Sequence, residues 1–118
     1  MQSEIKKLTR IIDEMTYVLM HKGSTDLDIK IKRSKDVSTI YMVDYNTQYS
    51  DEDIEDLNKI LNIQRQCEVE QFYWELMGDD SHEDELFLVG SMIDKATVNK
   101  IDNDLHIVIY RYLKCGIS

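Results

Sequence analysis

The chain has 118 residues, of which 42% are hydrophobic and 31% are charged. This length and mixture predict one folded domain over residues 1–118, and they exclude a disordered or a membrane-embedded class of protein. Asp and Glu outnumber Lys and Arg by 23 to 14, which gives a formal net charge of −9. Such a charge repels the phosphate backbone of nucleic acids, so we expect no nucleic acid and no membrane as partners.

The two cysteines, Cys67 and Cys115, lie far apart in the sequence. No secretory signal pattern precedes the first expected helix, and no apolar run approaches the roughly 18 residues of a membrane span. We therefore expect a cytoplasmic protein in which both cysteines are free thiols. His21, His82 and His106 show no ligand-type spacing, so we predict no metal site.

The first half of the chain predicts one helix and a hairpin. Apolar residues recur at intervals of three and four over residues 3–21, which is typical of an amphipathic helix, and Gly23 follows its end. Residues 26–33 alternate between apolar and charged side chains and predict a half-buried strand. The β-branched and aromatic residues at 37–43 predict the strand that pairs back on it. The apolar side of the first strand consists of Leu27, Ile29 and Ile31.

The second half predicts further helices and a second hairpin. Ser50 and Asp53 have the spacing of a capping box, which predicts a helix over about 51–61. The rest is expected to contain a helix at 66–77, an exposed acidic loop at 79–85, a short helix at 85–93, and strands at 95–101 and 104–113.

This order of elements predicts an α/β (α+β) fold. Two hairpins would form one mainly antiparallel sheet of about four strands, and the helices would bury their apolar stripes on one of its faces. The expected architecture is a two-layer sandwich in a single domain.

Three segments carry a family pattern in the same order along the chain. Residues 13–21 read Asp-Glu-Met-Thr-Tyr-Val-Leu-Met-His, residues 44–54 read Asp-Tyr-Asn-Thr-Gln-Tyr-Ser-Asp-Glu-Asp-Ile, and residues 85–98 read Glu-Leu-Phe-Leu-Val-Gly-Ser-Met-Ile-Asp-Lys-Ala-Thr-Val. Together they resemble the nucleotide boxes of the GHKL superfamily, the histidine-kinase-like ATPase domains, and most closely the anti-sigma-factor serine kinases. The resemblance implies a Bergerat-type fold and a bacterial regulator in signal transduction.

The resemblance also implies roles for particular residues. Asp44 stands where the family has the carboxylate that accepts a hydrogen bond from adenine, and Asn46 replaces a glycine of the following turn. Tyr17 stands where the family has the asparagine that holds magnesium, and Asp13 stands where it has the general base. The residues by themselves favour a strand-end aspartate that caps a loop at Asp44 and a solvated helix residue at Asp13.

Three replacements predict that the nucleotide site has degenerated. The phenol of Tyr17 is a poor substitute for an amide ligand of magnesium, and Gln48 fills space where the family has a glycine. Glu85 replaces the glycine whose amide would bind phosphate, and Glu83 and Asp84 add further negative charge beside it. We therefore expect that ATP and magnesium binding has been lost.

The expected function is that of a regulatory protein-interaction module with no catalytic residue and no cofactor. The alternative is a divergent but active ATP-dependent protein kinase or ATPase of the same superfamily, with ATP and magnesium as cofactors and Asp13 as base. A cavity that binds another small ligand is a third possibility. The expected partner is a signalling protein or a second copy of the chain. The aromatic cluster of Phe72, Tyr73 and Trp74 fits either core packing or a partner-facing patch.

Overall fold

The computed structural model describes residues 3–70 and 85–115. The aromatic cluster of Phe72, Tyr73 and Trp74, the acidic residues at 79–84 and most of the expected helix at 66–77 lie outside the described residues. The described elements are α1 (Glu4–His21), β1 (Leu27–Arg33), β2 (Val37–Asp44), α2 (Asp51–Leu61), the 3-10 helix η1 (Cys67–Val69), α4 (Glu85–Met92), β3 (Lys95–Ile101) and β4 (Asp104–Tyr112).

Helix starts are set by local side-chain caps. Ser3 caps α1 by accepting a hydrogen bond from the backbone N–H of Lys6. Ser50 and Asp53 form the expected capping box of α2, because each side chain accepts from the backbone N–H of the other residue. The expected start of a helix at residue 66 is wrong in part, because η1 opens this segment as a 3-10 turn closed by the N–H of Glu70.

The described strands form one antiparallel sheet in the order β1-β2-β4-β3. Each hairpin pairs its own two strands, and β2 pairs with β4 in the middle of the sheet, with Ile40 opposite Ile109. Asp102 has a φ of 60° in the tight turn between β3 and β4, a conformation that aspartate tolerates better than most residues. The predicted fold class is confirmed.

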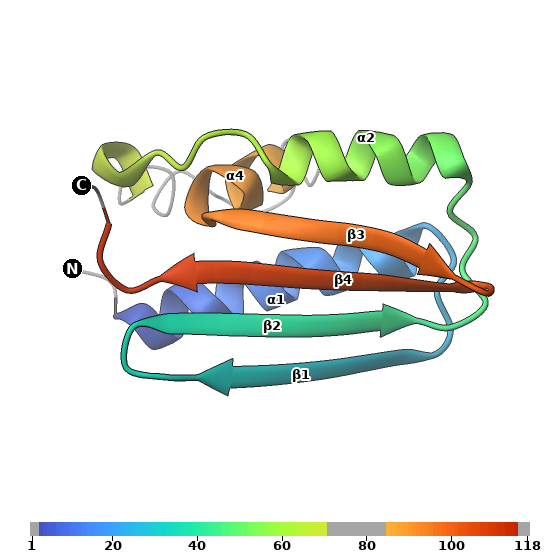
Figure 1. Cartoon of the computed structure of the whole chain (residues 1–118), viewed down its shortest axis with the longest axis horizontal. Coiled ribbons are helices and arrows are strands. Elements are labelled where there is room, and N and C mark those ends of the chain that lie inside the picture. The colour runs from blue at the N-terminus through green and yellow to red at the C-terminus, as the bar shows by residue number, and fades with distance from the viewer. Residues whose placement is uncertain (1–2, 71–84, 116–118) are drawn as a thin grey trace.

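The helices form a second layer on one face of the sheet, and α1 lies behind the strands in the view of Figure 1. Between the layers, α1, α2 and α4 pack their apolar side chains on those of β2, β3 and β4. Close contact between α2 and α4 depends on Gly90, since a Cβ at this position would lie 2.2 Å from the carbonyl oxygen of Ile60. No other residue type fits at this crossing without a shift of backbone.

The first strand departs from its prediction. Ile29 and Ile31 were expected on a half-buried face, but they are 40% and 46% exposed. They lie opposite the buried residues Met42 and Ile40, so their side chains are on the helix-bearing side of the sheet. They stay accessible because α2 packs on the other edge strand, β3, whereas the described helices do not pack closely on β1.

Helices among the described residues lack the combination of length and apolar character that a membrane crossing requires.

Candidate functional site

The carboxylate of Asp44 lies at the end of β2, where the sequence resemblance placed it, and it is 1% exposed. Both of its oxygens accept hydrogen bonds from hydroxyl groups of the chain. Ser24 Oγ donates to Oδ1 at 2.6 Å, and Thr47 Oγ1 donates to Oδ2 at 2.7 Å. Asp44 therefore fastens the loop after α1 to the turn after β2.

The turn after β2 is fixed by further bonds. Thr47 Oγ1 also accepts from the backbone N–H of Tyr49 at 3.2 Å, and the N–H of Thr47 donates to the carbonyl of Asn103 at 3.0 Å. Asn46 has a φ of 52°, a left-handed conformation that asparagine tolerates better than most residues, and its N–H donates to Asp104 at 3.0 Å. This region of the site is a rigid junction between the two hairpins.

A pocket of about 230 Å³ lies beside this junction, between the end of α1, α2 and the start of α4. The phenol ring of Tyr49 forms part of its wall and is buried. Burial, with the nearby charges of Asp44 and Asp53, raises the pKa of Tyr49 to about 12, so this phenol stays neutral. The lining residues are Lys22, Tyr49, Asp53, Asp56, Leu57, Ile60 and Leu86.

The one basic residue among the described residues that line the pocket, Lys22, is already paired with Asp53. Lys22 Nζ lies 2.9 Å from Asp53 Oδ2 and 5.4 Å from the centre of the Tyr49 ring. The backbone N–H of Ser50 and the ammonium of Lys22 lower the pKa of Asp53 to about 2. The second carboxylate, that of Asp56, gives the lining a net negative charge.

Two of the residues named by resemblance are placed away from this pocket. Tyr17 is exposed and stacks on His21, with the ring centres 5.7 Å apart, and Asp13 is exposed on α1. Neither is among the residues that line the pocket. The phenol in the pocket wall is that of Tyr49, a residue to which the sequence resemblance gave no role. Gln48 lies against the loop after α1, since a Cβ on Gly23 would be 3.1 Å from its Cγ.

A second polar cluster lies at the other end of the sheet, around the buried side chain of Arg111 in β4. Its guanidinium donates to both oxygens of Glu4, at 2.7 and 3.1 Å, and to both oxygens of Glu70, at 3.3 Å. It also donates to the carbonyl of Met92. Burial lowers the pKa of Arg111, but the bonds to Glu4 and Glu70 outweigh burial and raise it. This guanidinium is therefore always charged and ties three elements together.

Sequence reasoning missed this cluster, although one signal was present. Arg111 occupies the inward phase of β4, in line with Leu105, Ile107 and Ile109. An arginine at such a position must be paired when the strand is buried, because burial of an unpaired charge costs on the order of several kcal/mol. The identity of its partners was not readable, since Glu4 and Glu70 lie far away in the sequence.

Arg65 extends the cluster toward β3. Its Nε donates to Glu70 at 2.7 Å, and its Nη1 donates to Asp94 at 2.9 Å and to the carbonyl of Tyr112 at 2.9 Å. Lys7 of α1 lies 3.5 Å from Glu70. Burial raises the pKa of Glu70, but the bonds and charges of Arg65 and Arg111 outweigh burial and lower it. Glu70 is thus a buried carboxylate held in its charged form.

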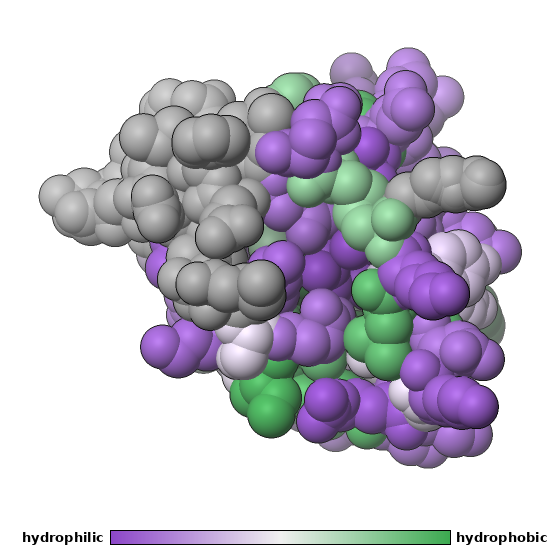
Figure 2. All heavy atoms as spheres, turned by 90° about the vertical axis from the view of Figure 1, so that its left-hand side faces the viewer, coloured by the Kyte–Doolittle hydropathy of each residue, from purple (hydrophilic) through white to green (hydrophobic). Residues whose placement is uncertain are grey.

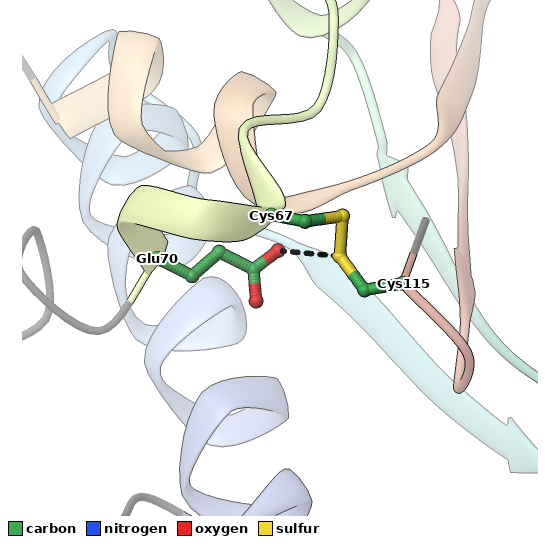
Figure 3. Close-up of side chains that lie close together, drawn as sticks. All are labelled: Cys67, Glu70 and Cys115. Atoms are coloured by element: carbon green, nitrogen blue, oxygen red, sulfur yellow. Dashed lines mark hydrogen bonds between the residues drawn. A yellow bond between two sulfur atoms is a disulfide. The ribbon is translucent and has the colours of Figure 1, made fainter. Parts of the chain in front are cut away.

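The two cysteines form a disulfide next to this carboxylate, so the prediction of two free thiols is wrong. Cys67 lies in η1 and Cys115 follows β4, and their Cα atoms are 5.7 Å apart although 48 positions separate them in the sequence. Figure 3 shows the bond beside Glu70, whose Oε2 lies 3.9 Å from the sulfur of Cys115. A disulfide sulfur carries no hydrogen, so this contact becomes a hydrogen bond only when Cys115 is reduced.

Among the described residues, Cys67, Glu70 and Cys115 are the group whose atoms are close enough to hold a metal ion. The chemistry of this set is unfavourable, because both sulfurs are joined to each other and the carboxylate already pairs with two guanidinium groups. A cysteine binds a metal ion as a thiolate, and a sulfur in a disulfide is not one. The cluster is a cross-link beside an ion-pair network.

Figure 2 views the end of the molecule that carries this cluster and both termini. Outside the grey atoms, hydrophilic side chains cover most of this face, and the hydrophobic side chains stand in small separate groups. A broad apolar docking surface is therefore not visible on the part of this face that is described.

Comparison with protein-family models, with curated proteins and with solved structures finds no match for this chain.

Proposed function

We propose that this chain is a histidine-kinase-like ATPase domain that has lost ATP and magnesium binding and acts in signalling by binding another protein. The observation that carries the proposal is the state of Asp44. Its carboxylate is 1% exposed, and the hydroxyls of Ser24 and Thr47 engage both oxygens. The assignment to this superfamily rests on the resemblance of residues 13–21, 44–54 and 85–98 to its nucleotide boxes.

Adenine recognition through Asp44 would require a rearrangement of this junction. The amino group of adenine would have to reach a carboxylate that is closed off by two loops and displace a short bond from Ser24 or Thr47. A displaced hydroxyl buried without a partner costs about 1–3 kcal/mol. The neighbouring pocket, at about 230 Å³, is also smaller than the roughly 300–1,000 Å³ of ordinary ligand sites.

The charges around the pocket oppose a triphosphate as well. Asp53 and Asp56 are part of its lining, and the ammonium of Lys22 already neutralises Asp53 at 2.9 Å. Each unpaired like-charge contact at 4 Å costs on the order of 1 kcal/mol in water and about 4 kcal/mol near a protein surface. These contacts support the loss of nucleotide binding.

Protein recognition is supported by the face of the sheet that the described helices leave uncovered. Tyr41 is exposed there beside Val108 and Tyr110, which lie on the neighbouring strand. Lys30 lies 5.6 Å from the Tyr41 ring and Lys95 lies 5.0 Å from the Tyr110 ring. Aromatic side chains are enriched in protein interfaces, where their large rings give much contact area.

Isothermal titration of the full chain with ATP and magnesium tests the loss of nucleotide binding. We expect no saturable heat for the wild type. Asp44→Asn and the exposed control Asp36→Asn are titrated in parallel after circular dichroism has confirmed that both are folded. Micromolar binding that Asp44→Asn abolishes and Asp36→Asn preserves would reject the proposal and establish the active ATP-dependent alternative. Binding that both variants preserve would place a nucleotide site elsewhere and would equally reject it.

A further inference from the structure

The outer edge of the sheet at β1 has a self-complementary pattern of charge and apolar side chains. In Figure 1, β1 is the outermost strand, and among the described residues it pairs only with β2. The N–H of Tyr45 donates to the carbonyl of Asp26, and the N–H of Ser34 donates to that of Val37. Since bonding alternates along an antiparallel strand, even-numbered residues of β1 direct their backbone groups to β2. The odd-numbered residues direct theirs to the open edge, and these are Leu27, Ile29, Ile31 and Arg33.

The side chains of this edge include apolar groups that the described residues leave partly exposed. Ile29 and Ile31 are 40% and 46% exposed, on the side of the sheet that carries the helices. A seven-residue edge strand with exposed isoleucines is a template for strand pairing. Proteins usually block such an edge with charge, and β1 does contain Asp28, Lys30 and Lys32 on its other side.

We propose that β1 pairs with β1 of a second copy of this chain, antiparallel, about a two-fold axis at Ile29. This register sets Ile29 opposite Ile29 and Leu27 opposite Ile31 of the second copy. These are the residues whose backbone groups point outward, so they form the hydrogen-bonded pairs of the new ladder. The result is one continuous sheet through both copies, with an apolar row on the helix side.

The charged side chains select this register. On the uncovered side of the sheet it sets Asp28 opposite Lys30, and just before the strand it sets Asp26 opposite Lys32. The two-fold axis makes each pair occur twice. Opposite charges directly across two strands stabilise the pairing, and like charges oppose it.

Neighbouring two-fold registers all bring like charges together. An axis at Lys30 sets Lys30 against its own copy, and an axis at Asp28 sets Asp28 against its own copy. Each of these axes also forms two opposite-charge pairs, Asp28 with Lys32 or Asp26 with Lys30, whereas the axis at Ile29 forms four and no like-charge pair. An axis at Ile31 sets Lys30 against Lys32 twice. The charges that block other strands from this edge therefore favour one pairing, that of the chain with itself.

The chain has a net charge of −9, so two copies repel each other on average. The two-fold axis also brings the basic residues of β1 near those of the second copy. The pairing therefore depends on the short-range charge pairs and the apolar contacts, and not on long-range attraction. A second copy would thus be the partner in the protein-binding role proposed above, and only this assignment of a role rests on that proposal. The pairing itself is argued from the residues of β1 alone.

Sedimentation velocity of the full chain, from micromolar to millimolar concentrations, tests the dimer. We expect a concentration-dependent dimer for the wild type. Asp28→Lys and Lys30→Asp each set like charges opposite one another at two places, and each is expected to weaken the dimer by at least about tenfold. An equimolar mixture of these two variants restores opposite charges at both places. The mixture is therefore expected to dimerise at concentrations at which each variant alone is monomeric.

Two further variants complete the design. The doubly exchanged chain Asp28→Lys/Lys30→Asp is expected to dimerise like the wild type. Lys59→Asp, on the exposed side of α2, makes the same change of net charge as Lys30→Asp and is expected to leave the dimer unchanged. Circular dichroism checks folding, because Asp28 accepts a bond from Tyr45 at 2.6 Å. A monomeric wild type, a dimer that both single variants keep, or a mixture of folded variants that stays monomeric would overturn the inference. A dimer that binds ATP would reject only the proposed function, and a monomer that does not bind ATP would reject only this one.

Discussion

Arg111 and Glu4 lie 107 positions apart in the sequence and form a two-point ion pair, with nitrogen to oxygen distances of 2.7 and 3.1 Å. The pair joins the last strand to the first turn of the first helix. The same guanidinium also donates to both oxygens of Glu70. Segments from the beginning, the middle and the end of the chain therefore meet at one buried charge.

Removal of Arg111 should therefore be among the most destabilising single changes. Arg111→Met leaves Glu70 and Glu4 without their shared partner, and we expect a loss of about 3–5 kcal/mol in the free energy of unfolding. Urea denaturation measures it, with Lys59→Met on the exposed side of α2 as the matched control. A loss below that of ordinary surface substitutions, about 0.5 kcal/mol, would show that the pair does not hold the fold.

Acid should weaken the same cluster through Glu70. Its pKa is lowered in the folded protein, so its contribution is fully present above the unfolded pKa of about 4.5 and is lost as the pH falls through the lower, folded pKa. Urea midpoints measured downward from about pH 6, where the contribution is still fully present, should fall less steeply for Glu70→Gln than for the wild type. Glu52→Gln, in the first turn of α2, serves as the comparison and should keep the wild-type slope. Equal slopes for all three proteins would contradict the assignment.

The disulfide should contribute to stability by restricting the unfolded chain. It closes a loop across a sequence separation of 48, for which the chain-entropy estimate is about 4 kcal/mol. Measured values are commonly about 2–4 kcal/mol, so Cys67→Ser/Cys115→Ser should lower Tm by roughly 10 °C. A reducing agent should lower the Tm of the wild type to that of the double variant and leave the variant unchanged. A wild-type Tm that is insensitive to reduction would speak against the bond.

Thr47 should be critical for the junction around Asp44. Its hydroxyl donates to Asp44 and accepts from the backbone N–H of Tyr49, so Thr47→Val keeps the shape but removes both bonds. We expect a loss of about 2–4 kcal/mol, because a buried carboxylate oxygen and a buried N–H each lose a partner. Thr97→Val, at an exposed position of β3, is the isosteric control and should change stability by less than about 0.5 kcal/mol. Similar values for the two variants would show that Asp44 does not depend on this hydroxyl.

Much of the secondary structure could be predicted because its causes are local. The three-and-four spacing of Leu8, Ile11 and Met15 is enough to predict α1, and the capping box at Ser50 sets the start of α2 at the observed residue. For the candidate site, Asp44 and Asn46 were predicted at the turn after β2. The sequence also allowed Asp44 to be a strand-end aspartate that caps a loop. Its partners could not be predicted, because the hydroxyls that donate to Asp44 come from Ser24 and Thr47 on two different loops.

The elements, the fold class and the turn that carries Asp44 could thus be predicted from the order of residues, since periodicity and capping act over a few residues. The pairing of distant groups could not, and it became known from the folded chain: Cys67 with Cys115, and Arg111 with Glu4. The same holds for the open edge at β1, where Ile29 and Ile31 remain accessible. Such contacts depend on how whole layers pack, and no spacing along the chain encodes the distance between residues on different layers.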